Sequence, residues 1–446
     1  MSNILAVAKT PSTISVTSAQ CEPSFAEAGR WLPEQLDPAD PDYAKSFTAG
    51  LLGKAAGVGA SDVHLHRVAA GLWIRWRIDG VLQEVGTFSA GLSSDVVTRL
   101  KVLAGLLTYR SDAPQEGRLQ TDEPAAAHNV EMRLSTFPSL HGESAVIRIF
   151  AADQQLNDLD DLGLPADVAE QLTHQLAETS GAILVTGPAG SGKTTTCYAA
   201  LRHIAASTAG ARSIVSIEDP VEVAVPGVAQ SQVAPAAGFD LAAGLKALLR
   251  QDPEVVMVSE IRDPTAASLA LGASLTGHLV LGSFHAGSAA GAIGRLADMG
   301  VEPYVLRAGV LAIVSQRLVR RLCDCAAPAD SEEEKLGLPV AHARRPVGCP
   351  KCHESGYRGR TLLAELLLPR SETLGRAVLS GADSVTIEQL AIDAGMTTRW
   401  HRAIDSVQAG ITSCSEVLRV LGFNDPWSHQ KPDASARQNS NERTPR

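Results

Sequence analysis

The sequence lacks long hydrophobic runs and an excess of positive charge. No apolar stretch approaches the roughly eighteen residues that a membrane-spanning helix needs, so we expect no transmembrane segment. The opening MSNILAVAKT is too short for a signal peptide, and no positively charged segment precedes it. Lys and Arg number 39 against 49 Asp and Glu, a net charge of −10, which argues against nucleic acid as the main partner. We therefore expect a cytoplasmic protein.

Length and composition are those of a folded protein with several domains. The chain has 446 residues, of which 45% are hydrophobic and 20% charged, and a single core rarely grows beyond about 250–300 residues. Changes in pattern along the chain predict six segments. They are a mobile leader at 1–42, a small α+β domain at 43–155, an α/β domain at 156–320, a four-cysteine segment at 321–360, a helical subdomain at 361–425 and a disordered tail at 426–446.

The two larger segments have different secondary-structure patterns. In the first, DVHLH and LWIRWRIDGVLQEV alternate like half-buried strands, and Asp79–Gly80 is a strong hairpin-turn pair. In the second, the apolar strands AILVTG, SIVSIED, VVMVSE and HLVLGSF alternate with helical stretches. This alternation is typical of a parallel sheet with crossover helices.

A glycine-rich motif predicts a nucleotide site. The segment GPAGSGKT at 187–194 matches the phosphate-binding pattern G-x-x-x-x-G-K-[ST] and follows the apolar strand AILVT. Its glycines let backbone N–H groups turn inward around phosphates at the positive end of the next helix. Lys193 should reach the outer phosphates, and the Thr194 hydroxyl should ligate Mg²⁺. The predicted ATP-binding residues are Gly187, Pro188, Ala189, Gly190, Ser191, Gly192, Lys193, Thr194 and Thr195.

Acidic residues end two other strands, where a magnesium–nucleotide site needs them. VVMVSE ends in Glu260, which could hold the Mg²⁺ shell or polarise the attacking water, or be an ordinary exposed carboxylate. SIVSIED ends in Glu218 and Asp219, so the acidic ends of both strands could converge on one metal. His285 follows the next strand at the same edge and is a candidate for γ-phosphate contact. His278 precedes that strand and should lie at its opposite end.

Four of the seven cysteines form two close pairs. They are Cys323, Cys325, Cys349 and Cys352. In a reducing cytosol, such pairs favour a metal over disulfides. The C-x-x-C spacing of the second pair lets both thiolates face one tetrahedral ion, whereas the C-x-C spacing of the first is one residue tighter. We expect a structural Zn²⁺. The alternative is a decayed site with free thiols, and His342 or His353 could replace a ligand.

Four motifs together resemble a known family. GPAGSGKTTT, SIEDPVE, LLRQDPEVVMVSEIRD and TGHLVLGSFHAGSAAGAIGRLADMG stand in the order of its Walker A, Asp box, Walker B and His box. That family is the secretion ATPases of type II secretion systems and type IV pilus assembly. The resemblance runs from about residue 43 to 425 and includes RLSTFPSLHGES, QRLVRRLC and GYRGRTLLAELL.

The resemblance implies a RecA-like P-loop ATPase core, preceded by the small α+β (PAS-like) domain. It also implies an ATP-hydrolysing homohexamer on the cytoplasmic face of the inner membrane, driving assembly of pilin-like subunits with a platform protein and a recruiter. Carried over by position, Glu260 is the catalytic Walker B acid, Glu218 the Asp-box acid and His285 the γ-phosphate-side histidine. Arg133 and Arg148 match arginines that reach the nucleotide across a closed interdomain cleft, although either could be a solvated strand residue.

Three features depart from the family pattern. Ser259 stands where glycine is usual, the Cys323–Cys325 pair is C-x-C instead of C-x-x-C, and the leader is short for the domain that docks these ATPases on a recruiter. Three other interpretations compete with an assembly ATPase. A pilus-retraction motor would normally lack the four-cysteine segment, and a DNA-translocating hexamer would need a basic stripe. A non-hydrolysing scaffold would not need the intact Lys193 and Glu260.

Overall fold

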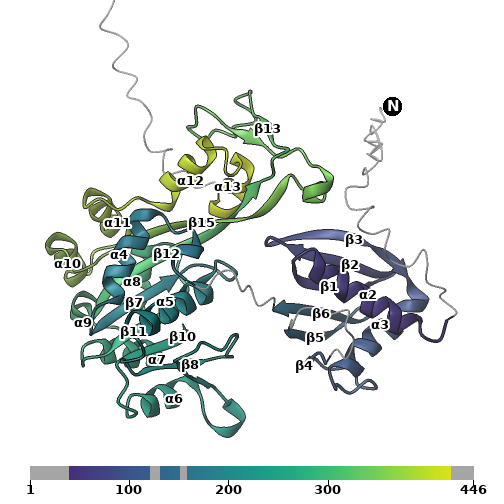
Figure 1. Cartoon of the computed structure of the whole chain (residues 1–446), viewed down its shortest axis with the longest axis horizontal. Coiled ribbons are helices and arrows are strands. Elements are labelled where there is room, and N and C mark those ends of the chain that lie inside the picture. Colours follow the sequence, from purple (N-terminus) through teal and green to yellow (C-terminus); the bar gives the residue numbers. More distant parts are fainter. Residues whose placement is uncertain (1–39, 121–130, 151–157, 423–446) are drawn as a thin grey trace, which may run out of the picture.

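The structure, a computed structural model, describes residues 40–120, 131–150 and 158–422. Figure 1 shows an amino-terminal domain built on one sheet and a larger domain built on a second. None of the helices in the described ranges combines the length and apolar character needed to cross a membrane. The predicted tail, and the predicted leader up to residue 39, lie outside the described residues.

The amino-terminal domain is a six-stranded antiparallel sheet with two helices packed on one face (Figure 1). Its strand order is β3-β2-β1-β6-β5-β4. The elements are α2 (Tyr43–Gly57), β1 (Ala60–Val68), β2 (Gly71–Ile78), β3 (Val81–Ser89), α3 (Ala90–Leu103), β4 (Gln115–Arg118), β5 (Glu131–Ser139) and β6 (Gly142–Phe150). The predicted hairpin joins β2 to β3. Asp79 and Gly80 have φ values of 48° and 81°, as a two-residue turn with both φ positive requires.

Strict alternation divides the two faces of this sheet. Ile74, Trp76 and Ile147 are fully buried under the helices. Their strand neighbours point the other way, so the opposite face is polar. This polar face carries Arg133 and Arg148, which are paired across β5 and β6.

The larger domain is a seven-stranded sheet in the order β15-β12-β7-β11-β10-β8-β9. All neighbouring pairs are parallel except β12 and β15. Its first elements are η1 (Asp160–Leu162), α4 (Ala166–Leu176), β7 (Gly181–Thr186), α5 (Lys193–Ser207), β8 (Ile214–Glu218), β9 (Ala229–Gln232), η2 (Pro235–Ala237), α6 (Leu241–Leu248), β10 (Val255–Ile261), α7 (Pro264–Ser274), β11 (Leu279–Phe284), α8 (Ala289–Asp298) and α9 (Pro303–Gly309). Every residue of β7, β8 and β11 is buried, because helices cover both faces.

A long antiparallel pair of strands shifts two predicted boundaries. β12 (Val310–Leu322) continues past residue 320, and β15 (Tyr357–Leu367) crosses the border placed at 361, so both cuts fall inside strands. The four-cysteine segment is therefore an excursion from the ends of this pair, with β13 (Ala327–Pro328), β14 (Arg344–Arg345) and η3 (Pro350–Cys352). The last described part of the chain, up to residue 422, is helical, as predicted: α10 (Glu372–Leu379), α11 (Ser384–Asp393), α12 (Arg399–Gln408) and α13 (Cys414–Leu421).

Candidate functional site

The glycine-rich loop leaves β7 and ends at α5, as the sequence predicts. Gly187, Gly190 and Gly192 all have positive φ. At Gly187 a side chain is also excluded by space, since a Cβ would lie 2.5 Å from Ser191 Oγ and 2.6 Å from the Gln316 carbonyl oxygen. The loop is thus tightly curled against the middle of β12, and the amino end of the following helix α5 points at the loop.

Lys193 folds back over this loop. Its Nζ donates to the carbonyl oxygens of Gly187 at 3.1 Å and Pro188 at 3.0 Å. Burial lowers the pKa of Lys193, and the nearby Glu260 carboxylate opposes this. The Ser191 hydroxyl is buried beside it, with no hydrogen-bond partner among the described residues. A buried ammonium and an unsatisfied hydroxyl on a curled loop fit a phosphate group, and Thr194, half-buried in the first turn of α5, would hold Mg²⁺.

Gln316 on β12 braces the loop, and sequence reasoning missed it. Its side chain is fully buried. The amide Nε2 donates to the Ser191 carbonyl oxygen at 2.8 Å, and Oε1 accepts from Thr196 Oγ1 at 3.1 Å. One side chain therefore fastens both the loop and the first turns of α5. The signal available in the sequence was a lone amide after the apolar run VLAIV.

Glu260 and His285 meet beside the loop, at the carboxyl ends of β10 and β11. Glu260 Oε1 contacts His285 Nε2. His285 Nδ1 lies 3.0 Å from the Gly187 carbonyl oxygen, so Nδ1 carries a proton and donates there. The other carboxylate oxygen of Glu260 accepts from Arg262 at 2.6 and 2.9 Å. The structure therefore brings the predicted acid and histidine to the phosphate loop. His278 lies at the far end of β11, as expected.

Glu218 and Glu260 share no hydrogen-bond or ion-pair partner among the described residues. It is 1% exposed, and both of its oxygens already accept hydrogen bonds, from Tyr198 on one side and from Ser216 and Gln230 on the other. The next residue, Asp219, is the one that shares Arg262 with Glu260, at 3.4 Å. The expectation that both acidic strand ends face one metal stays a prediction, with Asp219 closer to Glu260 through their shared Arg262. Glu218 ties the Asp box to α5 because Tyr198 belongs to that helix.

Ser259, which departs from the family pattern, has a definite role in the structure. Its hydroxyl accepts a hydrogen bond from the Asp219 backbone N–H at 3.2 Å. Its carbonyl oxygen accepts from the Ser283 hydroxyl. Three neighbouring strands are therefore cross-linked at the edge that carries Glu260.

Arg133 and Arg148 lie on the amino-terminal domain and contact its own acids. Arg133 Nε is 3.1 Å from Glu131, and Arg148 Nε is 3.1 Å from Asp62. Both guanidinium groups act electrostatically on Glu222, the last residue of the Asp box. Burial and Glu218 raise the pKa of Glu222, and Arg148 and Arg133 oppose that rise. The structure does not bring either arginine into contact with Lys193 or Glu260, so their predicted nucleotide contact requires a change of position.

The four cysteines cluster as predicted. Their sulfur atoms lie within 4.8 Å of one another, and three separations are 3.7, 3.8 and 3.9 Å. A tetrahedral ion with metal–sulfur bonds of about 2.3 Å would set these edges at about 3.8 Å. The Cys352 backbone N–H lowers the pKa of the Cys349 thiol to about 7. The C-x-C pair reaches the cluster despite its tighter spacing, and neither His342 nor His353 belongs to it among the described residues.

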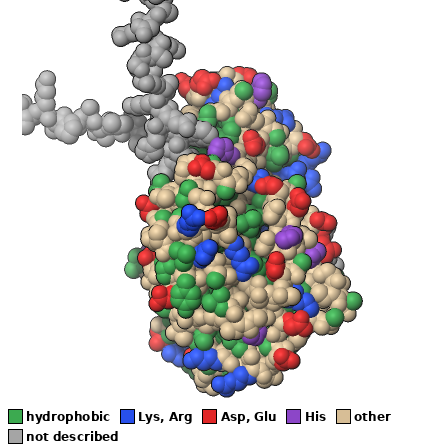
Figure 2. Space-filling model, turned by 90° about the vertical axis from the view of Figure 1, so that its left-hand side faces the viewer, with side chains coloured by type: hydrophobic (Ala, Val, Ile, Leu, Met, Phe, Trp, Pro, Cys, Tyr) green, Lys and Arg blue, Asp and Glu red, His purple; other side chains and the backbone are tan. Residues whose placement is uncertain are grey.

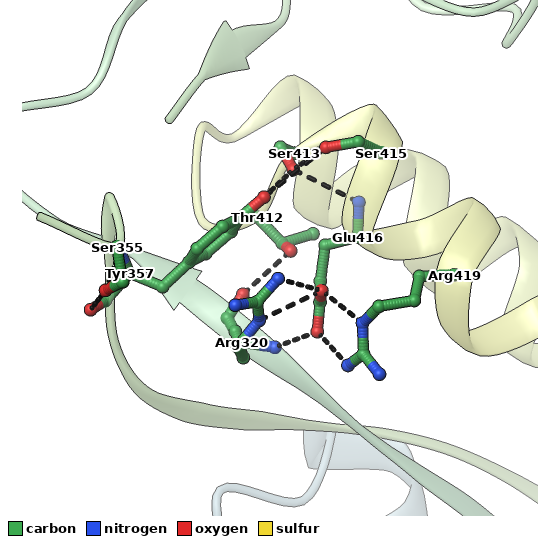
Figure 3. A network of polar contacts seen from close by, with 8 residues as sticks. All are labelled: Arg320, Ser355, Tyr357, Thr412, Ser413, Ser415, Glu416 and Arg419. Carbon is green, nitrogen blue, oxygen red and sulfur yellow. Dashed lines mark hydrogen bonds and ion pairs between the residues drawn. The ribbon is translucent and has the colours of Figure 1, made fainter. Parts of the chain in front are cut away.

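A buried ionic network lies next to this segment (Figure 3). Glu416 of α13 has no exposed side-chain surface and accepts from Arg320 of β12 at 2.9 and 3.0 Å and from Arg419 at 2.5 and 2.7 Å. Burial alone would raise the pKa of Glu416, but the hydrogen bonds from these two arginines outweigh it and lower the pKa. Arg320 also stacks on Tyr357, the first residue of β15. The network fastens the last described helix to the β12–β15 pair.

Comparisons with known proteins place the chain in a family. The family described as "Type II/IV secretion system protein" matches residues 40–419. The Type II secretion system ATPase E of Vibrio cholerae is 42% identical over 377 residues, covering 83% of this chain and 74% of the relative. The Type IV pilus assembly ATPase PilB of Thermus thermophilus is 36% identical over 401 residues, covering 88% of this chain and 44% of PilB.

A solved structure shares the fold. The ATPase DotB of Legionella pneumophila aligns with a TM-score of 0.61 at 18% identity, covering 85% of this chain and 96% of DotB. The fold, the phosphate loop and the acid beside it define a P-loop ATPase. More particularly, the chain belongs to the Type II/IV secretion system protein family.

Proposed function

We propose that the chain is the assembly motor of a type II secretion system or type IV pilus. As a cytoplasmic homohexamer, it would hydrolyse ATP to drive assembly of pilin-like subunits through a platform protein of the inner membrane. A recruiter would hold the hexamer at the membrane. The single observation that carries this proposal is the meeting of Glu260, His285 and the Lys193 loop in a chain of this family. Relatives from both systems support it.

Hydrolysis would proceed by positioning and charge. Mg²⁺, which Thr194 would hold, would neutralise phosphate charge when bound. Lys193 would leave its two carbonyl partners for phosphate oxygens, and Glu260 would orient and polarise the attacking water. For that step Glu260 has to exchange at least one of its present contacts with Arg262 and His285 for the water. His285 would then contact the γ-phosphate through Nε2 while Nδ1 stays hydrogen-bonded to the loop.

The amino-terminal domain, PAS-like in our assignment, would complete the site on closure. Its polar face presents Arg133 and Arg148, which are held on the strand surface by ion pairs with Glu131 and Asp62. A guanidinium brought to the nucleotide only in the closed state would stabilise the transferring phosphoryl group, and would couple hydrolysis to domain movement. Their electrostatic effect on Glu222 supports an approach of the two arginines along the Asp-box segment.

The four-cysteine cluster would hold a structural Zn²⁺. The sulfur–sulfur separations support this, since they match the edges of a zinc–thiolate tetrahedron. The ion would fix the excursion between β12 and β15 without taking part in ATP chemistry. This segment also favours assembly over pilus retraction, and the net charge of −10 disfavours DNA translocation.

A complementation experiment in the host tests the proposal. A strain lacking the gene should regain exoprotein secretion or surface pili from the wild-type chain but not from Glu260→Gln. Glu254→Gln is the matched control, because that glutamate lies at the opposite end of the same strand and is 55% exposed. Restoration by Glu260→Gln would contradict the motor function. Excess pili without the gene would point to retraction, and turnover stimulated by single-stranded DNA to translocation.

A further inference from the structure

Arg317 lies beside the phosphate loop, on the strand that braces it. Because side chains alternate along a strand, Arg317 faces away from the side on which Gln316 grips α5. Arg317 Nη1 donates to the Gln316 carbonyl oxygen at 2.9 Å, and Nη2 donates to the Gly287 carbonyl oxygen at 2.8 Å. The first of these carbonyls is the one that a Cβ on Gly187 would strike. Gly287 follows His285 by two residues. The guanidinium is thus held between the loop's first glycine and the histidine segment.

The neighbouring charges leave Arg317 without an acid of its own. Glu260 is paired with Arg262 and His285. Glu365, fully buried on β15, accepts from Arg399 Nη1 at 2.8 Å and from two backbone N–H groups. Among the described residues no carboxylate contacts Arg317, and its hydrogen bonds go to carbonyl oxygens alone.

Lys193 is in the same position, with only carbonyl oxygens as partners. The two cations repel each other electrostatically, because the positive charge of Arg317 adds to burial in lowering the pKa of Lys193. Burial and Arg399 likewise lower the pKa of Arg317 to about 10, although the Glu365 carboxylate, which is paired with Arg399, opposes this. Two partly desolvated cations that repel each other at one loop are costly unless an anion joins them.

We propose that Arg317 is a catalytic residue that binds the terminal phosphate of ATP from within the same chain. A guanidinium has five N–H donors, so three remain after the two carbonyl bonds. These can bind phosphate oxygens while the carbonyl bonds keep the side chain in place, which is the preorganised arrangement that favours a charge developing in the transition state. Arg317 would act in each chain by itself, unlike Arg133 and Arg148, which need domain closure. No bond is made to the arginine, so its role is electrostatic.

The test compares binding of the transferring phosphoryl group with binding of the rest of the nucleotide. Arg317→Gln and Arg317→Lys are compared with the wild-type chain in steady-state hydrolysis and in binding of fluorescent ADP and of ADP with aluminium fluoride, which mimics the transferring phosphoryl group. Arg212→Gln is the matched control. That arginine is also largely buried and donates to a carbonyl, Glu178 at 3.2 Å, but it precedes β8 at the opposite edge of the sheet.

We expect kcat to fall by about 100-fold in Arg317→Gln, the usual loss for one preorganised donor. Affinity for ADP and the thermal midpoint should stay near wild type, and aluminium fluoride should no longer tighten ADP binding. Arg317→Lys should recover part of kcat, since lysine keeps the positive charge but lacks the planar array of N–H donors of a guanidinium.

Wild-type kcat in Arg317→Gln, or an equal loss of ADP and ADP–aluminium fluoride binding, would overturn the proposal. If Arg317→Gln does not fold, the Lys variant decides by the same two criteria. The proposal rests on the nucleotide site, and failure of the wild-type chain to bind ADP would refute that site instead.

Discussion

Replacing Gln316 by leucine should loosen the phosphate loop while leaving every predicted nucleotide-binding side chain in the sequence. Leucine fills a similar volume but offers no partner to the Ser191 carbonyl oxygen or the Thr196 hydroxyl, which Gln316 reaches at 2.8 and 3.1 Å. Each buried atom left unsatisfied costs about 1–3 kcal/mol. Because these atoms belong to the loop and to α5, we expect much of the loss to appear in nucleotide binding. If about 1–2 kcal/mol does, ADP affinity falls roughly 5- to 30-fold.

A double-mutant cycle makes this prediction specific. Thr196→Val removes the other partner of one of the two hydrogen bonds, so Gln316→Leu and Thr196→Val together should cost less than their sum by about 0.5–1.5 kcal/mol. Binding of fluorescent ADP and the thermal midpoint are measured for all four proteins. Thr412→Val is the control, because its hydroxyl donates to Arg320 far from the loop and should lower only the thermal midpoint. Additive costs with unchanged ADP affinity would refute the bracing role of Gln316.

Three further predictions concern the metal, the arginines and the ionic network. Elemental analysis should find about one zinc per chain, lost in Cys349→Ser with local unfolding, and well under half an equivalent in fresh wild type would rule out the four-thiolate site. Arg133→Ala and Arg148→Ala should lower kcat far more than ATP affinity, and wild-type turnover should rise more steeply than linearly with protein concentration; full activity in a monomeric 161–446 fragment would contradict both. Since the pKa of Glu416 is lowered in the folded chain, its stabilisation is present above the ordinary glutamate pKa of about 4.3 and is lost as pH falls through the lower folded value. Glu416→Gln should therefore lower the thermal midpoint at pH 7 and narrow its difference from wild type towards pH 3, and an equal difference at both pH values would contradict this.

The sequence predicted those parts of the site that local motifs and sheet geometry determine. Lys193 follows a motif whose spacing sets the loop, and Glu260 and His285 end neighbouring strands of a parallel sheet, so their meeting follows from topology.

The missed features depend on partners distant in the chain. Gln316 binds Thr196 across 120 residues, and nothing in either local pattern links them. In the sequence, Glu218 is an acidic residue at a strand end with no evident partner. Only the folded structure shows that the Tyr198 hydroxyl of α5 donates a hydrogen bond to it. The border at 361 failed because a short apolar run such as TLLAELL does not distinguish strand from helix.

Phosphate release at saturating Mg–ATP from the wild-type chain and from Glu260→Gln, measured beside ATP binding, tests the central claim most directly. The carboxamide keeps the size of the side chain but cannot polarise water. We therefore expect ATP binding within a few-fold of wild type and turnover lower by about 100-fold or more. Equal turnover by the two proteins would show that Glu260 is not the acid on which hydrolysis depends, and would contradict the account of this site.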